Sequence, residues 1–171
     1  LGFQAFFRFF RLTRPIAAAL FTLRFRLFGI LSDQAPVYSL NPPFLFLHQE
    51  TDPDSATSFY HRHDAALIER IADNVAGMRD ALKSQANAEL IFMPVPSKYT
   101  IYHTLINDDT YDGVLPRLCD AVEKRGVRTV RLYEKFVAEP GLTYFPTDTH
   151  WTPRGIEIAL DETMRALKGL Q

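Results

Sequence analysis

The sequence predicts an α/β domain built around a parallel sheet. Helix-like stretches with apolar residues at three- and four-residue steps alternate with apolar runs that are too short to be helices. Such alternation is typical of layered α/β structures, in which the crossovers between strands are right-handed. At 171 residues and 47% hydrophobic content, the chain suits one domain with a substantial core.

The first helix of the core is predicted over Phe59–Gln85. Its apolar residues recur at steps of three and four and define a single stripe, made of Ile68, Ile71, Val75, Met78 and Leu82. We expect this stripe to cover one face of the sheet.

The first strand is predicted at residues 88–96, "AELIFMPVP". This near-continuous apolar run ends at two prolines, as expected for a buried parallel strand. Its carboxyl end meets "SKYTIYH", residues 97–103. Functional groups gather at the carboxyl ends of strands in open α/β sheets, so this segment is a candidate part of a site.

A second helix is predicted over residues 111–125, where it ends at Gly126, and an alternating strand, "VRTVRLY", is predicted at residues 127–133. The closing helix has Thr152 as its N-cap and Pro153 at its first position. We expect this helix to bury Ile156, Ala159, Leu160, Met164 and Leu167.

Residues 33–58 are rich in Pro, Asp and Ser and are predicted to form a connecting loop with one short apolar run, Phe44–Leu47. Two strands leave long apolar helix faces without partners, so further strands are expected either in that run or outside this chain. We predict that residues 59–171 are part of an α/β domain. Because the chain does not begin with Met and shows no signal-peptide cleavage site, we expect it to be a fragment.

Residues 1–32 are predicted to form a basic, aromatic, helical segment with five arginines and no acid. The whole chain carries −1 and this segment +5, so the remainder carries −6. The longest uncharged stretch, Pro15–Leu23, is far shorter than the roughly 20 apolar residues of a spanning helix. The segment suits either a helix pair broken at Pro15 that lies on a membrane surface through residues 1–29, or packing on the rest of a larger protein. It contains no Lys and no nucleic-acid-binding signature, so we expect no nucleic-acid partner.

The stretch "TDTHWTP", residues 147–153, places an Asp two residues before a His at the start of the closing helix. Asp148 can accept a hydrogen bond from Nδ1 of His150 and leave Nε2 free as a base. The following helix N-terminus disfavours an imidazolium. Two other readings of this spacing remain open: an Asx-turn beside a surface His, and half of a metal site.

Metal and cofactor chemistry has little support in the sequence. His61 and His63 are two residues apart on a predicted helix, so their rings point in different directions. The single Cys119 excludes an internal disulfide and any multi-Cys site, and its helical apolar neighbours suit a small buried residue better than a nucleophile. No Gly-rich phosphate loop, H-E-x-x-H or G-x-S-x-G is present, and we expect no metal and no cofactor.

Four further residues are candidate substrate contacts: Ser97, Lys98, Tyr99 and Trp151. Three of them have a structural alternative. Ser97 suits the cap of a helix, which we favour, and Lys98 suits a solvated charge. Trp151 either forms a wall of the site or fills the core beneath the last helix.

Four stretches together resemble the SGNH-hydrolase-like proteins related to alginate O-acetyltransferases: "IFMPVPSKYTIYH", "DDTYDGVLPRLCDAVEKRGV", "VRLYEKF" and "YFPTDTHWTPRGIEIAL". The D-T-H-W-x-x-x-G block, Asp148–Gly155, is the most specific, and P-x-K-x-x-x-Y at Pro96, Lys98 and Tyr102 supports it. The resemblance implies a three-layer αβα, flavodoxin-like fold with a parallel sheet, incomplete in this chain. It also implies that Asp148 and His150 belong to a Ser-His-Asp triad.

The serine of such a triad lies in a G-[DNT]-S block, and this sequence has none. Its serines are Ser32, Ser39, Ser55, Ser58, Ser84 and Ser97, and none of them follows Gly-Asp. We therefore expect the nucleophile to lie outside this chain.

The resemblance implies an O-acetyltransferase or acetylesterase that acts on a bacterial envelope polysaccharide. The expected partners are the polysaccharide and a membrane-bound acetyl-donor protein, and the expected location is the periplasm or the membrane-associated envelope. The alternative function is that of a catalytically silent relative that binds polysaccharide or scaffolds an envelope assembly. A serine-independent metal hydrolase is a third hypothesis.

Overall fold

The computed structural model of the chain describes residue 20 and residues 37–40, 43–52, 58–59, 62–106 and 111–169. The chain divides into two units, Leu1–Pro36 and Val37–Gln171. The predictions for residues 1–32 lie almost wholly outside the described residues. Within the described part, no helix is both long enough and apolar enough to span a membrane.

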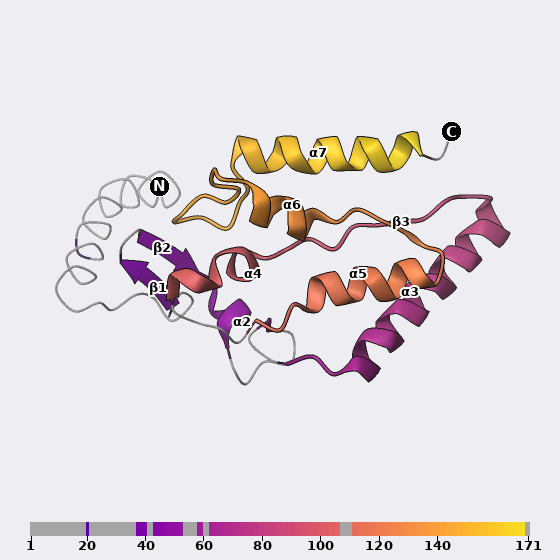
Figure 1. The fold of residues 1–171 in the computed structure, drawn as a ribbon, viewed down its shortest axis with the longest axis horizontal. Helices are drawn as coiled ribbons and strands as arrows, with labels where there is room; N and C mark the ends of the chain where they lie inside the picture. The colour runs from indigo at the N-terminus through magenta and orange to yellow at the C-terminus, as the bar shows by residue number, and fades with distance from the viewer. Residues whose placement is uncertain are drawn as a thin grey trace, which may run out of the picture. The chain divides into compact units, whose positions relative to one another are not determined.

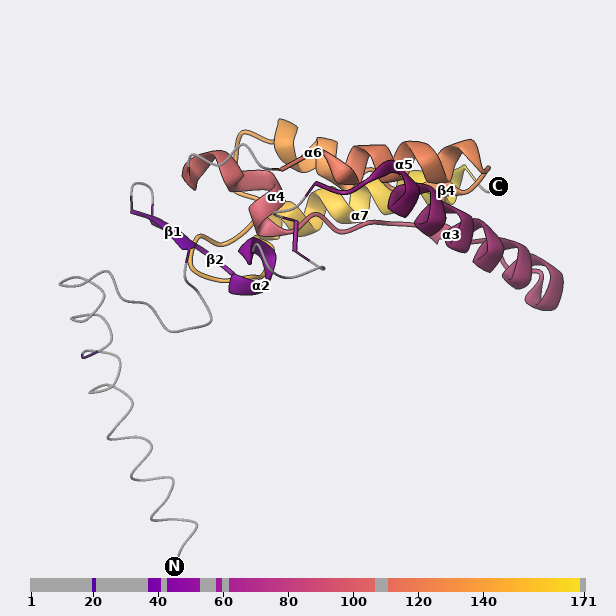
Figure 2. The same cartoon turned by 90° about the horizontal axis from the view of Figure 1, so that it is seen from below.

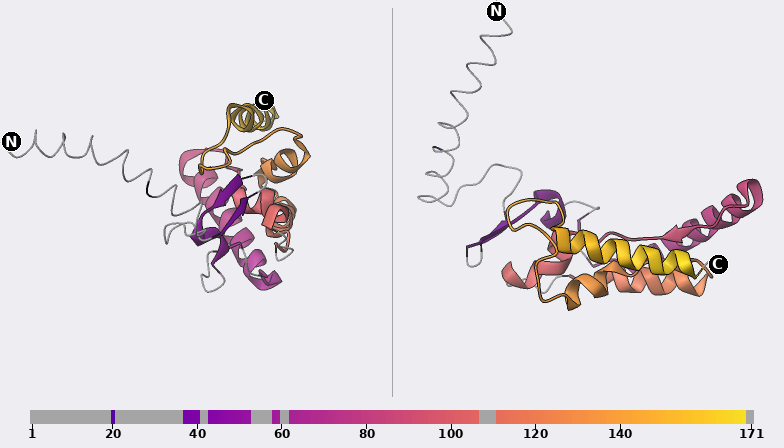
Figure 3. Two further views of the ribbon diagram at one scale, coloured as in Figure 1. Left: turned by 90° about the vertical axis from the view of Figure 1, so that its left-hand side faces the viewer. Right: turned by 90° about the horizontal axis from the view of Figure 1, so that it is seen from above.

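The second unit has the layered α/β architecture that the sequence predicts. Two parallel strands, β3 (Ile91–Phe92) and β4 (Arg128–Thr129), lie at its centre. Helices α3 (Ala65–Ala86) and α5 (Val114–Lys124) lie on one side of them, and α6 (Leu132–Ala138) and α7 (Pro153–Lys168) on the other (Figure 1). Seen from below, α5 and α6 follow one another along one edge (Figure 2). Figure 3 shows α7 and α3 on opposite sides of the body from another direction. The order helix, strand, helix, strand is as predicted.

The two parallel strands are shorter than the sequence predicts. Ile91 pairs with Arg128, and the ladder extends only to the hydrogen bond from the Val130 amide to the Phe92 carbonyl. The prediction of a buried strand over residues 88–96 is wrong in extent and burial, because Phe92 is only partly buried and Met93 is exposed. Prolines at two later positions of the run have no amide to donate, so pairing stops before them.

The second predicted strand, residues 127–133, is also shortened. Pairing ends at Thr129, and Leu132 begins helix α6 instead. Leu132 and Phe136, four residues apart, are both buried, and this spacing belongs to a helix rather than a strand. The alternating pattern of residues 127–133, which suggested a strand, therefore extends into helix α6.

Helix α3 begins at Ala65, later than the Phe59 that the sequence predicts. Asp64 is its N-cap, and its carboxylate accepts a 2.6 Å hydrogen bond from the Leu67 amide. The helix ends at Asn87, whose φ of 47° is a left-handed cap. Helix α5 begins after Gly113, and the two helices share a core with buried Ile68, Ala72, Leu115, Leu118 and Val122.

Residues predicted to be a connecting loop contain regular structure. Strands β1 (Val37–Leu40) and β2 (Pro43–Phe46) pair antiparallel, and α2 (His48–Thr51) follows. Phe44 and Phe46 are both buried against Tyr99, as expected when alternate residues of a strand face a core. A strand is therefore present within the short apolar run, which is one of the two places where further strands are expected from the sequence.

Helix α7 starts as predicted but presents a different face. Thr152 is its N-cap, with Oγ1 accepting from the Gly155 amide at 3.2 Å, and Pro153 is its first residue. The helix buries Gly155, Ile158 and Ala159. Four of the five residues predicted to be buried are 44–59% exposed: Ile156, Leu160, Met164 and Leu167.

The physical reason lies at the start of the helix. A Cβ added to Gly155 would collide with the Thr143 carbonyl and come within 3.3 Å of the Trp151 Cβ. The side of α7 that carries Gly155 therefore fits closely against the preceding loop. This close fit fixes the rotation of α7 about its axis.

Candidate active site

The Asp-x-His stretch forms a closed loop before α7. At its base, the Thr152 amide donates to the Thr143 carbonyl at 2.9 Å, and the Phe145 amide donates to the His150 carbonyl at 3.1 Å. Tyr144 and Trp151 form an antiparallel bridge between these two bonds. We call residues 143–152 the Asp-His loop.

Asp148 and His150 are paired within this loop. Nδ1 of His150 lies 2.5 Å from Oδ1 of Asp148, and the same oxygen accepts from the His150 amide at 3.0 Å. The hydrogen bond from the imidazole, and then the one from the amide, lower the pKa of Asp148 below its usual value. An ionised carboxylate only accepts, so in the neutral imidazole Nδ1 is the nitrogen that carries the proton, and Nε2 then has the free lone pair.

The predicted carboxylate–imidazole pair is therefore present in the structure. The Asx-turn alternative is present too, because the Asp148 side chain accepts from an amide two residues on. The side chains of Asp148 and His150 are 54% and 82% exposed, so the pair is accessible from solvent. Its catalytic role remains a prediction.

Lys98 fastens the tip of the Asp-His loop from below. Helix α4 (Lys98–Tyr102) follows β3, and a 3₁₀ turn at His103–Ile106 follows α4. The Lys98 ammonium donates to the carbonyls of Pro146 and Asp148, the second at 3.1 Å. Strand β2 adds a third bond, from the Leu45 amide to the Pro146 carbonyl at 2.9 Å.

Two tyrosines fasten the base of the loop. The Tyr102 hydroxyl accepts from the Thr143 amide at 2.8 Å and lies 3.0 Å from the Thr143 hydroxyl. The Tyr144 hydroxyl donates to the Pro96 carbonyl. The residues just after strand β3 therefore hold the Asp-His loop at both ends, which is a structural reason for the pairing of the P-x-K-x-x-x-Y and D-x-H-W stretches.

The Lys98 side chain lies in an apolar setting. The residue is 2% exposed, and its ammonium lies 5.0 Å from the centre of the Phe44 ring and 6.0 Å from that of Phe46. Burial lowers the pKa of Lys98 to about 8, against the opposing attraction of Glu50 and Asp148. Burial likewise raises the pKa of Glu50. The alternative that Lys98 is a solvated charge is wrong.

The other three predicted contacts have structural roles in the described part of the chain. Ser97 caps α4, with its hydroxyl accepting from the Thr100 amide at 3.3 Å. Tyr99 is fully buried, and its amide donates to Glu50. Trp151 is partly buried, with its ring 5.4 Å from that of Phe136 in an edge-to-face arrangement. The structure therefore agrees with the structural alternatives, in which Ser97 is a helix cap and Trp151 is a core residue.

Sequence reasoning missed several residues that shape the site, namely Glu50, Tyr102, Thr143 and Tyr144. The P-x-K-x-x-x-Y spacing was a signal for Tyr102, since it places Lys and Tyr one helical turn apart. Nothing in the sequence marked Glu50, which reaches Tyr99 across 49 positions of the chain.

The described residues hold no cluster of three or more His, Cys, Asp or Glu side chains arranged to bind a metal ion. Cys119 is buried on α5, and burial raises the pKa of its thiol to about 11. A thiol with so high a pKa is protonated at neutral pH, which fits the reading of Cys119 as a small buried residue.

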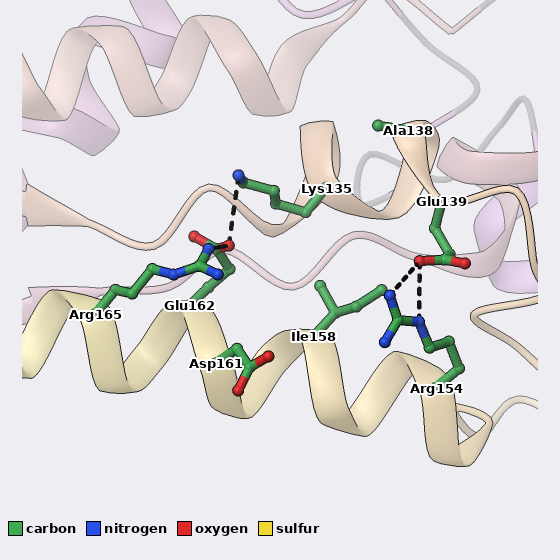
Figure 4. A pocket seen from close by; sticks show the side chains of 8 residues that line it. All are labelled: Lys135, Ala138, Glu139, Arg154, Ile158, Asp161, Glu162 and Arg165. Carbon is green, nitrogen blue, oxygen red and sulfur yellow. Dashed lines mark hydrogen bonds and ion pairs between the residues drawn. The ribbon is translucent and has the colours of Figure 1, made fainter.

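A separate groove lies between α6 and α7, with a volume of about 270 Å³ (Figure 4). Its three cationic side chains each have an acidic partner: Arg154 pairs with Glu139 at 2.9 Å, Lys135 pairs with Glu162 at 3.5 Å, and Arg165 also pairs with Glu162. The cations are therefore already neutralised within the groove.

A carboxylate–imidazole pair in a loop at the start of a helix, on a parallel sheet covered by helices on both sides, defines a hydrolase-like α/β domain. The model of one protein family, described as "SGNH hydrolase-like domain, acetyltransferase AlgX", matches residues 42–171. The chain belongs to this family.

Two relatives were compared with the chain. A probable alginate O-acetylase AlgJ of Pseudomonas syringae pv. tomato is 32% identical over 105 residues, which are 56% of this chain and 27% of that protein. The solved O-acetyltransferase domain of Pseudomonas putida AlgJ superposes with a TM-score of 0.54 at 22% identity, covering 81% of this chain and 46% of that one. The structural likeness establishes the SGNH-like fold, and the chain spans about a quarter of the curated relative's length.

Proposed function

We propose that this chain contributes the acid–base half of an O-acetyltransferase for a bacterial envelope polysaccharide. The observation that carries the proposal is the 2.5 Å contact between His150 Nδ1 and Asp148 Oδ1 in an accessible, firmly anchored loop. This geometry holds one tautomer of the imidazole and leaves Nε2 available as a base, which is the role of the Asp-His part of a Ser-His-Asp triad.

The proposed reaction has two steps. First, Nε2 of His150 takes the hydroxyl proton of a serine while the serine oxygen attacks the acetyl carbonyl of the donor, and the proton then goes to the departing donor group. Second, a sugar hydroxyl gives its proton to Nε2 and attacks the acetyl-serine, and the serine oxygen regains the proton. Water as acceptor in the second step releases acetate, so the same machinery describes an acetylesterase.

The serine of the proposed triad is not in this chain. The sequence has no G-[DNT]-S block, and described serines form local bonds: Ser58 with the Glu50 carbonyl, Ser84 with the Ala81 carbonyl, and Ser97 as the α4 cap. We propose that the serine comes from a part of the protein outside this 171-residue chain. Residues 59–171 would then be one portion of the SGNH-like domain.

The substrate and setting extend the same proposal. The match to an alginate O-acetylase supports a polysaccharide acceptor, and we propose a membrane-bound acetyl-donor protein as the partner. The proposed location is the periplasmic side of the cell envelope. Residues 1–29 would then lie on the membrane surface, with arginines at lipid phosphates.

The test is acetyl release and transfer by the full-length protein. We expect turnover of p-nitrophenyl acetate and transfer to polysaccharide, and a loss of about 10²- to 10⁴-fold in kcat for His150→Ala. His63→Ala is the matched control, because His63 also lies beside a carboxylate, that of Asp112, at 3.5 Å. Equal turnover by His150→Ala and the unmodified protein would remove His150 from the mechanism.

The same experiment distinguishes the proposed acetyltransferase from the alternative, a catalytically silent relative. A full-length protein that binds polysaccharide but transfers no acetyl group would be the silent, scaffolding relative.

A further inference from the structure

We propose that Lys98 is a positioning residue: its buried ammonium fixes the backbone of Asp148, and through it the tautomer of His150. Lys98 lies on α4, 50 positions from Asp148 in the sequence, and touches neither side chain of the pair. Its influence therefore passes through the Asp148 main chain.

The bond from Lys98 to the Asp148 carbonyl is the part of the contact that has no substitute in the described structure. The Pro146 carbonyl also accepts from the Leu45 amide, so it keeps a partner when the ammonium is removed. The Asp148 carbonyl accepts from Lys98 at 3.1 Å. Loss of the Lys98 ammonium thus removes a backbone anchor from Asp148, the residue whose carboxylate holds the His150 imidazole.

The other anchors of the Asp-His loop act elsewhere. Tyr102 holds Thr143 and the Tyr144 hydroxyl holds the Pro96 carbonyl, both at the base of the loop. At the tip, the Leu45 amide holds the Pro146 carbonyl and the Asp148 amide donates to the Phe145 carbonyl at 3.4 Å, so the bond to the Asp148 carbonyl is the one that Lys98 supplies.

The surroundings of the ammonium favour this role over contact with a ligand. The rings of Phe44 and Phe46 on β2 lie beside it, and Glu50 on α2 and Asp148 are the titratable groups whose charges act on it. Two carbonyl oxygens accept from the ammonium in this buried setting, where a charge-assisted hydrogen bond is about twice as strong as a neutral one.

The consequence for acetyl transfer rests on the proposed function, whereas the positioning itself has its own measurement. The ¹⁵N shifts of the His150 ring distinguish the Nδ1–H from the Nε2–H tautomer. We expect the Nδ1–H form in the unmodified protein. In Lys98→Met, which keeps the chain length and loses the charge, we expect the Nε2–H form to gain about ten- to a hundredfold in relative population, the effect of one charged hydrogen bond.

Lys83→Met is the matched control, since Lys83 is an exposed lysine on α3 paired with Glu89 at 2.6 Å. It should leave the His150 tautomer unchanged.

The unmodified protein gives a second measurement that needs no variant. The pKa of Lys98 is lowered to about 8, so raising the pH from 7 to 9.5 removes the charge while Asp148 stays ionised. The tautomer ratio should shift with a midpoint near pH 8. The folded state binds this proton more weakly than the unfolded chain, so this group does not lower global stability over the same range.

An unchanged tautomer in Lys98→Met and across the pH range overturns the inference. If Lys98→Met fails to fold, the pH titration decides alone. A tautomer shift without any acetyl transfer by the unmodified protein would support the positioning and refute the proposed function. Acetyl transfer that depends on His150, with no tautomer shift, would support the proposed function and refute the positioning by Lys98.

Discussion

Gly155 offers a sharp test of how α7 is seated. Alanine at this position is expected to destabilise the fold, because its Cβ would collide with the Thr143 carbonyl. That carbonyl cannot easily move away, since it accepts from the Thr152 amide while the Thr143 amide donates to Tyr102. Forcing a methyl group into such a site costs about 1–3 kcal/mol.

Helix propensity works in the opposite direction. Replacing glycine by alanine inside a helix is worth roughly 0.5–1 kcal/mol in favour of alanine. The net expectation for Gly155→Ala is therefore a loss of up to about 2.5 kcal/mol. Gly77 on α3 supplies the matched control, because nothing lies within 4 Å of a Cβ added there. Gly77→Ala should stabilise by about 0.5–1 kcal/mol.

Urea unfolding of the two variants and the unmodified protein measures the difference directly, as midpoint shifts at constant slope. The free energies of unfolding of the two alanine variants should differ by about 1–3 kcal/mol, the cost of the collision, because the gain in helix propensity is common to both. Equal effects at the two positions would refute the argument that Gly155 fixes the rotation of α7.

Three further outcomes are expected. Tyr102→Phe removes the hydroxyl that accepts from the Thr143 amide and should cost about 1–3 kcal/mol in urea unfolding, because the buried amide loses its partner; a cost near zero would mean that water replaces the hydroxyl. Ile158→Ala should cost about 2–4 kcal/mol and Leu160→Ala less than about 0.5 kcal/mol, and reversed values would restore the face of α7 that the sequence predicts. The Asp148 carboxyl should titrate below the usual value of 3.8 in a ¹³C-detected experiment, and the order of the loop should be lost as the pH falls through that lowered pKa; a normal or raised midpoint would argue against the pairing.

Contacts between near neighbours in the sequence were predictable. Thr152 caps α7, Pro153 begins it, and Asp148 meets His150 two residues away. In each case the geometry depends on a few backbone angles that residue types at fixed spacing determine.

Contacts between distant residues were not predictable in the same way. Lys98 was a candidate substrate contact because only its neighbours in the sequence were visible, and the carbonyls that it holds lie 48 and 50 positions away. The face of α7 was wrong for a related reason, since apolar residues occur on both sides of the helix and the choice between them is made by the Gly155 contact with Thr143. Strands β3 and β4 were found but their lengths were overestimated. The apolar run of β3 continues past Pro94, which has no amide to pair, and the alternating run of β4 continues into helix α6.

The anchoring of the Asp-His loop by α4 also sets a limit on how the pair can be transplanted. A synthetic peptide of residues 144–155 would contain Asp148, His150 and the helix cap. It would lack the contacts that Lys98, Tyr102 and Leu45 make with the loop. The smallest portable unit that keeps these donors is therefore three segments, residues 43–46, 96–102 and 143–155, presented together by a host scaffold. Grafting residues 143–155 alone would transfer Asp148 and His150 without the contacts that fix their geometry.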